Sequence, residues 1–445
     1  MYVHRQEMSR EARLSNNESL LLTKRGDIIS LAKEIAMDLM NKITERIDSF
    51  RDEMIDMQIQ LCSFPAISPA SGGEGEVKKA ECLLEFLKAN GFDDIAVIKA
   101  PDLDAPSGYR PNILAIYKGK SSAKTIWIMT HMDVVPPGEL ELWNGNPHKA
   151  WVEGGKIFGR GVEDNQQDMV ASLYALKAFH TEGIIPESDV GIALVADEET
   201  GSEKGIDYVL QKSNRFRKQD LIIVPDAGNK DGTMIEVAEK SILWLKFKTL
   251  GVQAHGSTPD KGVNSFRAAS FLVTELNGLY ELYPERDSLF DPPNSTFEPT
   301  KKEPNVPNIN TIPGEDVFYM DSRILPKIKL DEVKKKIRNI AEKVEKKFQV
   351  EITMENVQEA PAAPPTSPEA PVVHALQKAI KAVYKEEGKP IGIGGGTVAA
   401  IFRRANFDAA CWSKVEETAH QPNEYCVIDN MMGDAKVFAH IFLQK

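Results

Sequence analysis

The sequence has little of what a disulfide-stapled or nucleic-acid-binding protein needs. Its 445 residues include only four cysteines, at positions 62, 82, 411 and 426, and no two of them form a C-x-x-C pair. This scarcity argues against a disulfide framework and a thiolate zinc site, and it favours a reducing compartment. Basic residues are also in deficit. With 54 Lys and Arg against 66 Asp and Glu, the net charge of −12 argues against general binding to nucleic acids or anionic membranes.

Export signals and membrane spans are absent from the sequence as well. The first residues, MYVHRQEMSREARLSNNESLLL, carry charges throughout, and no apolar run approaches the roughly 18 residues of a membrane helix. We therefore expect a cytoplasmic protein that binds small polar molecules. Its 445 residues predict two or three domains, because a common domain has about 150.

Apolar periodicity predicts an α/β body. Between residues 112 and 226, the short apolar runs NILAIY, TIWIMT, VGIALVA and LIIV alternate with helical stretches such as 165–180. This alternation is typical of a mostly parallel sheet flanked by helices. Residues 1–50 precede it as a predicted helical extension, because apolar side chains recur there at three- and four-residue steps, namely Ile28, Leu31, Ile35, Leu39 and Ile43.

A second unit is predicted from residue 241 onward. SILWLKFKTL, DVFYMDSRI and QVEITM are strand patterns, and helical patterns cover 264–279 and 330–348. With a further short strand expected near 308–312, the order is β-α-β-β-α-β, a ferredoxin-like arrangement. The proline-rich APAAPPTSPEAP then leads back to the α/β body. We therefore expect an α/β domain in two parts, 1–240 and 358–445, interrupted by an inserted domain at 241–357.

Residue types that bind metal follow several of the predicted strands. In an open α/β sheet, ligands bind just beyond the carboxyl ends of the strands. The residues at or near these positions are His131, Asp133, Asp164, Glu198, Glu199, Asp226 and His420. Two histidines with several carboxylates and no cysteine suit zinc or a similar divalent ion, and two such ions can share one bridging carboxylate.

Each of these residues also has an ordinary structural interpretation. Asp164 alone would more often be a helix N-cap, and His420 an ordinary surface histidine. Glu198 and Glu199 alone would more often be solvated loop carboxylates. Their shared position after strands favours a site. Because Glu198 and Glu199 are adjacent, they point apart in an extended chain, so one can bind metal while the other addresses a water molecule.

The glycine-rich segment at 392–397, GIGGGT, could be mistaken for a phosphate-binding loop. It lacks the Lys-Ser/Thr of a P-loop, and no G-x-G-x-x-G register follows a strand early in a βαβ unit. We therefore do not expect a nucleotide cofactor.

The ordered set of motifs resembles a family of dinuclear-metal amidohydrolases and exopeptidases. This family includes acetylornithine deacetylase, succinyl-diaminopimelate desuccinylase, aminoacylase and glutamate carboxypeptidase. The resemblance covers nearly the whole chain beyond the N-terminal helix. The matching stretches, in family order, are THMDVVP, GGKIFGRGVEDNQQ, VADEETGSEKG, VPDAG, LGVQAHGSTPDKGVNS, NINTIPGE with DSRILP, GGGT and AHQPNEY.

The resemblance implies two divalent metal ions per subunit. Zinc is the expected metal, with cobalt or manganese as alternatives. The implied ligands are His131 and Asp226 for one ion, Glu199 and His420 for the other, and Asp164 as the bridge between them.

The same resemblance implies three further roles around the metals. Glu198 would be the general base, and Asp133 would hold the second ring nitrogen of His131. His255, in AHGSTPDKG, would reach across a homodimer and stabilise the oxyanion in the partner's site. The inserted domain would then serve as a lid and as the dimerisation surface. Without the resemblance, His255 would be an ordinary loop histidine near the turn-forming Pro259.

Substrate-binding residues are implied too. Asn310 and Arg323 resemble the substrate-binding pair on the inserted domain, and the planar fork of an arginine suits a carboxylate. Arg323 could instead be an ordinary strand-end arginine paired with Asp321. Gly394 and Gly395 lie in the loop that lines the family's substrate pocket with backbone amides.

We therefore expect a hydrolase of an amide bond next to a free carboxylate. It would deacylate N-acyl amino acids, as acetylornithine deacetylase or succinyl-diaminopimelate desuccinylase does. A di- or tripeptide exopeptidase is the alternative, and a non-catalytic relative that binds amino acids or peptides is a weaker one. The sequence departs from the family pattern at Val398, where Asp is common, and at 413–417, where SKVEE replaces a Gly-Pro-Gly run. These departures concern substrate identity, since the ligands and the base are intact.

Overall fold

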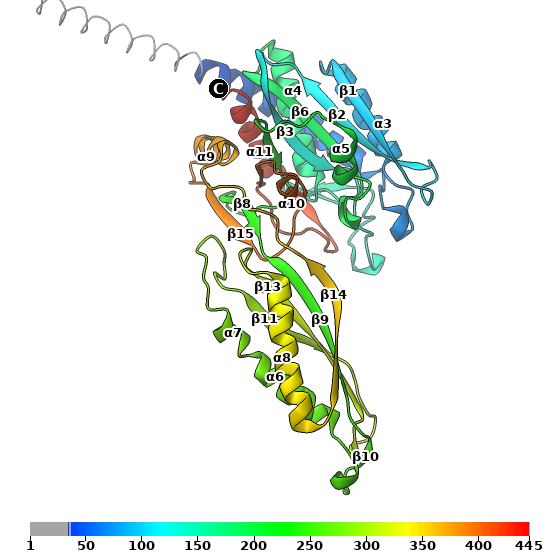
Figure 1. Ribbon diagram of the computed structural model, residues 1–445. Coiled ribbons are helices and arrows are strands. Elements are labelled where there is room, and N and C mark those ends of the chain that lie inside the picture. Colours follow the sequence, from blue (N-terminus) through cyan, green and yellow to red (C-terminus); the bar gives the residue numbers. More distant parts are fainter. Residues whose placement is uncertain (1–33, 35–36, 445) are drawn as a thin grey trace, which may run out of the picture.

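The protein consists of two sheet-based units arranged end to end (Figure 1). The computed structural model describes residue 34 and residues 37–444. Much of the predicted N-terminal extension lies outside these residues. Within the described part, 37–49 are helical, and the side chains of Met40, Ile43 and Ile47 are buried against the larger unit.

The larger unit is built on an eight-stranded sheet. Its central strands β6, β3, β7 and β16 are parallel neighbours, and β8 pairs with β15 in the same way. Antiparallel pairs join β1 to β2, β2 to β6, and β16 to β8. In spatial order the strands are β1 (Asp94–Pro101), β2 (Tyr109–Tyr117), β6 (Ser188–Val195), β3 (Ser121–His131), β7 (Leu221–Val224), β16 (Ala409–Cys411), β8 (Met234–Glu239) and β15 (Lys389–Ile393).

Helices cover both faces of this sheet, so its central strands are apolar almost throughout. Side chains of β3 alternate between two buried clusters: Ile126 and Ile128 pack on one face, and Trp127 and Met129 on the other. The first face is covered by α2 (Arg51–Cys62), α3 (Val77–Ala89), α4 (Gln166–Glu182), α9 (Pro371–Tyr384) and α11 (Ile428–Phe442). The second is covered by α5 (Ile206–Lys212) and α10 (Ala399–Arg404). This arrangement confirms the predicted α/β class with a mostly parallel sheet.

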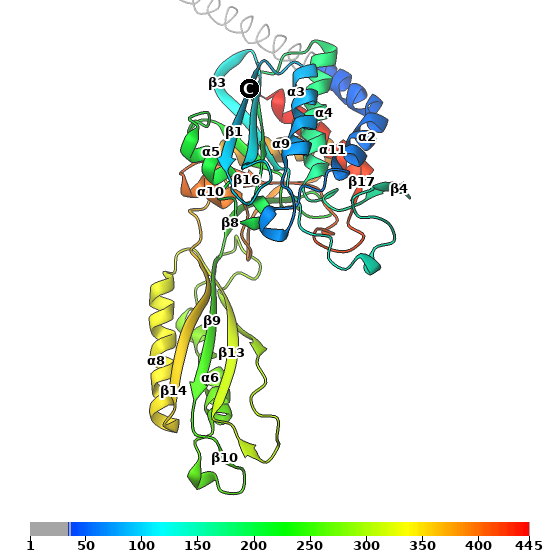
Figure 2. The ribbon, with the colours of Figure 1, turned by 90° about the vertical axis from the view of Figure 1, so that its right-hand side faces the viewer.

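The second unit is a four-stranded antiparallel sheet with its helices on one side (Figure 2). The spatial order is β11-β13-β9-β14, and the order along the chain is β-α-β-β-α-β. The apolar stripe of the long helix α8 packs on this sheet through Val333, Ile337 and Val344. The elements are β9 (Ser241–Leu250), α6 (Ser265–Leu276), α7 (Leu279–Leu282), β11 (Thr296–Lys302), β13 (Glu315–Ile324), α8 (Leu330–Phe348) and β14 (Glu351–Ala360).

One predicted strand of this unit was wrong. The segment 308–312 does not enter the four-stranded sheet. Only β12 (Thr311–Ile312) is extended there, and it pairs with β10 (Ala254–His255) in a separate two-stranded piece. The sheet instead uses β11, which contains Pro299 and a bulge between Pro299 and Lys301. Proline is tolerated there because β11 is an edge strand.

The remaining elements are short. A three-stranded sheet joins β17 (Tyr425–Val427), β5 (Lys156–Phe158) and β4 (Trp151–Glu153), and four single-turn helices are η1 (Pro69–Ser71), η2 (Leu140–Leu142), η3 (Glu198–Thr200) and η4 (Pro259–Lys261). Across the described residues, none of the helices has the length and apolar character to span a bilayer. The domain boundaries at 240/241 and 357/358 stay a prediction, and β14 runs three residues past the second of them.

Candidate active site

The predicted site residues of the larger unit meet at one edge of its sheet. His131 is the last residue of β3, Glu198 and Glu199 open η3 after β6, and Asp226 follows β7. These three strands are parallel neighbours, so their carboxyl ends share one edge. Long-range folding thereby brings together residues that are far apart in the sequence.

His131 lies at the buried end of this cluster. Its side chain is 1% exposed, and its Nε2 atom is 2.9 Å from Oδ1 of Asp164 and 3.2 Å from Oδ1 of Asp226. Although burial would lower the pKa of His131, hydrogen bonds to nearby carboxylates raise it well above its ordinary value. One imidazole therefore faces two carboxylates from different loops.

His420 lies at the open end. Its Nε2 atom is 3.1 Å from Oδ2 of Asp164 and 3.1 Å from Oε2 of Glu199. Hydrogen bonds to these two carboxylates raise the pKa of His420 to about 10. Asp164 thus presents one oxygen to each histidine, as the predicted bridging ligand would.

The donor chemistry of the cluster fits divalent metal ions. Two groups of three side chains offer atoms within 4.8 Å of one another, namely His131 with Glu198 and Asp226, and His131 with Asp164 and Glu199. Imidazole and carboxylate are ordinary ligands of zinc and related ions. The carboxylates that raise the pKa of both histidines would equally attract a bound cation.

Glu198 faces the cluster from η3. Burial and the nearby carboxylate of Asp226 raise its pKa well above the ordinary value. Its backbone N–H donates to Oδ1 of Asp133 at 3.1 Å, and the N–H of Glu199 donates to Oδ2 at 3.1 Å. Asp133 therefore orients the turn that carries both glutamates. Its carboxylate is also 3.5 Å from Nδ1 of His131, the nitrogen that it was predicted to hold.

A buried ionic network behind η3 was not predicted from the sequence. Asp197 adopts a left-handed backbone conformation, with φ of 64°. Its carboxylate accepts from the N–H of Lys204 at 2.9 Å and from Nη1 of Arg110 at 3.2 Å. Nε of Arg110 also donates to the buried Glu76 at 2.6 Å. The available signal was Arg110 itself, because a charge just before the buried run NILAIY requires a partner.

The predicted substrate pair on the second unit is split. Arg323 lies at the end of β13 next to the larger unit, and its Nη1 donates to the carbonyl of Gly394 at 2.8 Å. Asn310 lies at the opposite end, where its carbonyl accepts from the N–H of Gly256, next to His255. Figure 1 shows β10, which carries His255, pointing away from the larger unit. His255 and Asn310 are therefore together, and Arg323 is apart from them.

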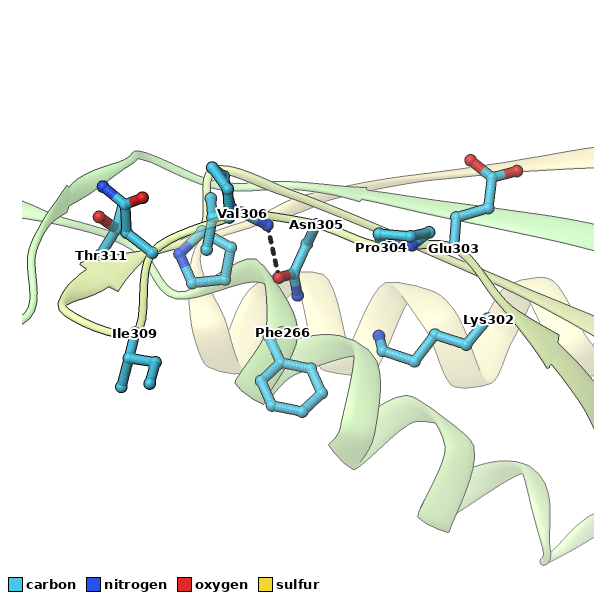
Figure 3. Close-up of a pocket in the computed structure, with 11 residues that line it drawn as sticks. Phe266, Lys302, Glu303, Pro304, Asn305, Val306, Ile309 and Thr311 are labelled. Atoms are coloured by element: carbon cyan, nitrogen blue, oxygen red, sulfur yellow. Dashed lines mark hydrogen bonds between the residues drawn. The ribbon is translucent and has the colours of Figure 1, made fainter.

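The tip that carries His255 and Asn310 has an open pocket beside it (Figure 3). Its volume is about 580 Å³, and Phe266, Lys302 and Ile309 line it. Ile309 is fully exposed, and Phe266 is 47% exposed. This end of the second unit thus combines accessible apolar side chains with two of the predicted site residues.

Val398 and Ser413, which belong to the two departures from the family pattern, are both buried. Val398 is buried in the apolar cluster beneath α10, where it packs with Ala399 and Phe402. In the 413–417 segment, the hydroxyl of Ser413 donates to the buried carboxylate of Asp168 at 2.5 Å. A Cβ added at Gly395 would meet, apart from its chain neighbours, only Cδ1 of Ile393 among the described residues, at 4.0 Å.

Comparisons with known proteins agree with this geometry. The model of the peptidase family M20/M25/M40 matches residues 127–444. An uncharacterized metallohydrolase from Methanocaldococcus jannaschii is 40% identical over 408 residues, covering 88% of this chain and 98% of that protein. A succinyl-diaminopimelate desuccinylase from Polynucleobacter necessarius is 23% identical over 384 residues, covering 84% and 94%. The structure of human carnosine dipeptidase 1 has a TM-score of 0.69 at 17% identity, covering 91% and 98%, which shows a shared fold.

These comparisons confirm the family that the ordered motifs resemble. The family match covers most of the chain, and it includes the histidines and carboxylates at the sheet edge. Membership implies divalent-metal binding, in agreement with the donor groups found there. The chain therefore belongs to peptidase family M20/M25/M40 and is a metal-dependent hydrolase of amide or peptide bonds.

Proposed function

We propose that the protein hydrolyses the amide bond of N-acyl amino acids, next to a free carboxylate, with two divalent metal ions. One observation carries this proposal: Asp164 presents its two carboxylate oxygens to two histidines, each of which faces a further carboxylate. His131 and Asp226 would hold one ion, His420 and Glu199 the other. When bound, such ions lower the pKa of water and polarise the scissile carbonyl.

Glu198 would act as the general base. It lies half-buried beside the proposed ligands, where a carboxylate can accept a proton and later return it. In this proposal its carboxylate takes a proton from the attacking water and delivers it to the departing amine. Asp133 would support this transfer because its carboxylate accepts hydrogen bonds from the backbone N–H groups of Glu198 and Glu199 and so orients their turn.

Arg323 would bind the free carboxylate of the substrate. Its Nε donates to Oδ1 of Asp321 at 2.7 Å and its Nη2 donates to Oδ2 at 3.0 Å, which fixes the plane of the guanidinium. The contact with Gly394 places that plane beside the glycine-rich loop. The remaining N–H groups can then bind a carboxylate between the two units.

A second copy of the chain would complete the site. His255 and Asn310 lie together at the far tip of the second unit, and the strand β10 that carries His255 lies at the end away from the larger unit with the proposed metal ligands (Figure 1). We propose a homodimer formed through the second unit, in which this tip reaches the partner's site and His255 stabilises the oxyanion. Two-fold symmetric dimers are the commonest oligomers, and the exposed Ile309 and Phe266 supply apolar contact area.

The alternative substrate is a short peptide. The fold shared with human carnosine dipeptidase 1 favours this alternative, whereas the similarity to a desuccinylase favours N-acyl amino acids. The chemistry proposed for Glu198 and for the ligands is the same in both.

A substrate panel would test the proposal. Purified protein is assayed with N-acetyl and N-succinyl amino acids and with dipeptides, after chelation and after addition of Zn²⁺, Co²⁺ or Mn²⁺. We expect hydrolysis of N-acyl amino acids that requires added metal and is lost when the free carboxylate of the substrate is amidated. The matched control is Glu198→Gln, which should bind metal and stay inactive. Cleavage of dipeptides alone would favour the alternative, and metal-independent hydrolysis would refute both.

A further inference from the structure

Two buried glutamates that the proposed mechanism does not use connect the loops of Asp164 and His420. The first is Glu424, four residues after His420, with a fully buried side chain. Its Oε1 accepts from the N–H groups of Glu163 at 3.0 Å and Asp164 at 3.1 Å. Its Oε2 accepts from the N–H of Gly161 at 3.0 Å and from Nη1 of Arg160 at 2.6 Å. A carboxylate next to the His420 loop thus holds the Asp164 loop.

The second glutamate makes the reverse connection. Glu163 immediately precedes Asp164, and its side chain is 4% exposed. Its Oε1 accepts from the N–H of Glu416 at 2.5 Å, and its Oε2 accepts from the N–H of Thr418 at 2.5 Å and the hydroxyl of Thr418 at 2.8 Å. A carboxylate next to Asp164 therefore holds the loop that leads into His420.

The conformation of His420 depends on such support. His420 has φ of 63° and Glu417 has φ of 61°, in the left-handed region that residues other than glycine adopt at a cost of roughly 1–3 kcal/mol each. His420 is also 54% exposed, so packing alone does not fix its ring. The hydrogen bonds from Glu416 and Thr418 to Glu163 hold the backbone on either side of Glu417, just before His420.

We propose that Glu163 and Glu424 form a reciprocal clasp that positions Asp164 and His420 and thereby sets the affinity for the metal ion held by His420 and Glu199. This inference rests on the two-metal site of the proposed function. Because each carboxylate accepts from backbone N–H groups of the opposite loop, the clasp acts through the backbone, and both glutamates are positioning residues. His131 and Asp226 lie at the ends of other strands and are not positioned by the clasp, so the ion that they would hold depends on the clasp only through the shared Asp164.

Glu424→Gln is the direct test. Glutamine keeps the shape of the side chain, but its NH₂ group faces N–H donors in place of an acceptor oxygen. We expect the ion held by His420 and Glu199, with Zn²⁺ or Co²⁺ as the probe, to bind about 10- to 100-fold more weakly, the range found when groups that orient metal ligands are removed. The other ion shares Asp164 but keeps His131 and Asp226, so its affinity should fall by a clearly smaller factor. Chelator competition measures both affinities, and the absorption spectrum of the Co²⁺ form reports the altered half-site.

The matched control is Glu236→Gln. Glu236 is also a fully buried glutamate paired with an arginine, Arg403, at 2.9 Å, but it lies on β8 and contacts neither loop. A purely structural role for buried glutamates predicts similar losses of stability in both variants, with the two metal affinities of each changed equally. The clasp predicts that the metal affinity falls more at the His420 half-site than at the other, and that it does so in Glu424→Gln only.

A milder variant covers the case in which Glu424→Gln does not fold. Thr418→Val keeps the side-chain shape and removes the hydroxyl that donates to Glu163. It should lower the affinity for the ion at His420 and Glu199 by a smaller factor and leave the affinity for the ion at His131 and Asp226 unchanged. Two equally tight sites in this variant would overturn the clasp. Wild-type protein that binds fewer than two ions would instead refute the proposed two-metal site, so the two failures are distinguishable.

Discussion

The sheet edge of the larger unit and the tip of the second unit hold their functional side chains in different ways. At the sheet edge, His131 is 1% exposed and contacts carboxylates of two other segments, Asp164 and Asp226. At the tip, His255 is exposed, and its Nδ1 pairs with the hydroxyl of Ser257 at 2.8 Å, two residues away. Long-range contacts prepare the first site within one chain. At the tip, the contacts of His255 are local and leave its side chain exposed.

The largest expected effect concerns Asp164, the proposed bridge between the two metal ions. Asp164→Ala removes a carboxylate that lies within 3.1 Å of both His131 and His420. We expect loss of activity and a greater loss of bound metal than in His420→Ala, which removes a ligand of one ion only. Elemental analysis of both variants checks this. About two equivalents of zinc in Asp164→Ala would contradict its bridging role.

The next effect separates metal binding from chemistry at the same edge. Glu198→Gln keeps the side-chain shape and removes the proton acceptor. We expect unchanged metal content, similar substrate affinity, and a kcat about 10²- to 10⁴-fold lower, the usual contribution of a general base. Steady-state kinetics and elemental analysis are the two measurements. Metal loss alongside the loss of activity would instead make Glu198 a ligand, as its place in one of the two donor groups allows.

A mixed dimer tests whether the tip serves the partner's site. One chain is wild-type and the other carries both His255→Ala and Glu198→Gln. If His255 acts across the interface, the wild-type base lacks its histidine and the other site lacks its base, so the purified mixed dimer should be almost inactive. Action within one chain would leave one complete site and about half the wild-type activity. Half activity, or a strictly monomeric active enzyme, would rule out the proposed exchange.

The sequence predicted the sheet edge well, because strand ends carry a strong signal there. The apolar runs placed β3, β6 and β7 correctly. The residues that follow each run therefore lie at the carboxyl end of that strand. The parallel order then requires His131, Glu198 and Asp226 to meet. The clasp gave no such signal, because Glu163 and Glu424 are separated by 261 positions and only the fold brings their loops together.

The tip was harder to predict because its segments are short and irregular. A two-residue strand such as β12 has no periodicity, so 308–312 could be placed in the wrong sheet. The edge strand β11 was missed because Pro299 and its lysines weaken the strand pattern of TFEPTKK. The split between Asn310 and Arg323 follows from the same geometry, since β13 carries the chain from the tip back to the larger unit.

The smallest expected effect concerns the tip alone. Ile309→Ser changes a fully exposed side chain that lines the pocket beside His255, so the stability of one chain should change by no more than about 0.5 kcal/mol. If the tip is buried in a dimer, the same change places a hydroxyl in an apolar contact. We then expect the dissociation constant of the dimer to rise about tenfold. Sedimentation at several concentrations measures this. Leu103→Ser is the matched control, because Leu103 is 97% exposed on the larger unit. Equal dimer dissociation constants in the two variants would contradict a dimer contact at Ile309.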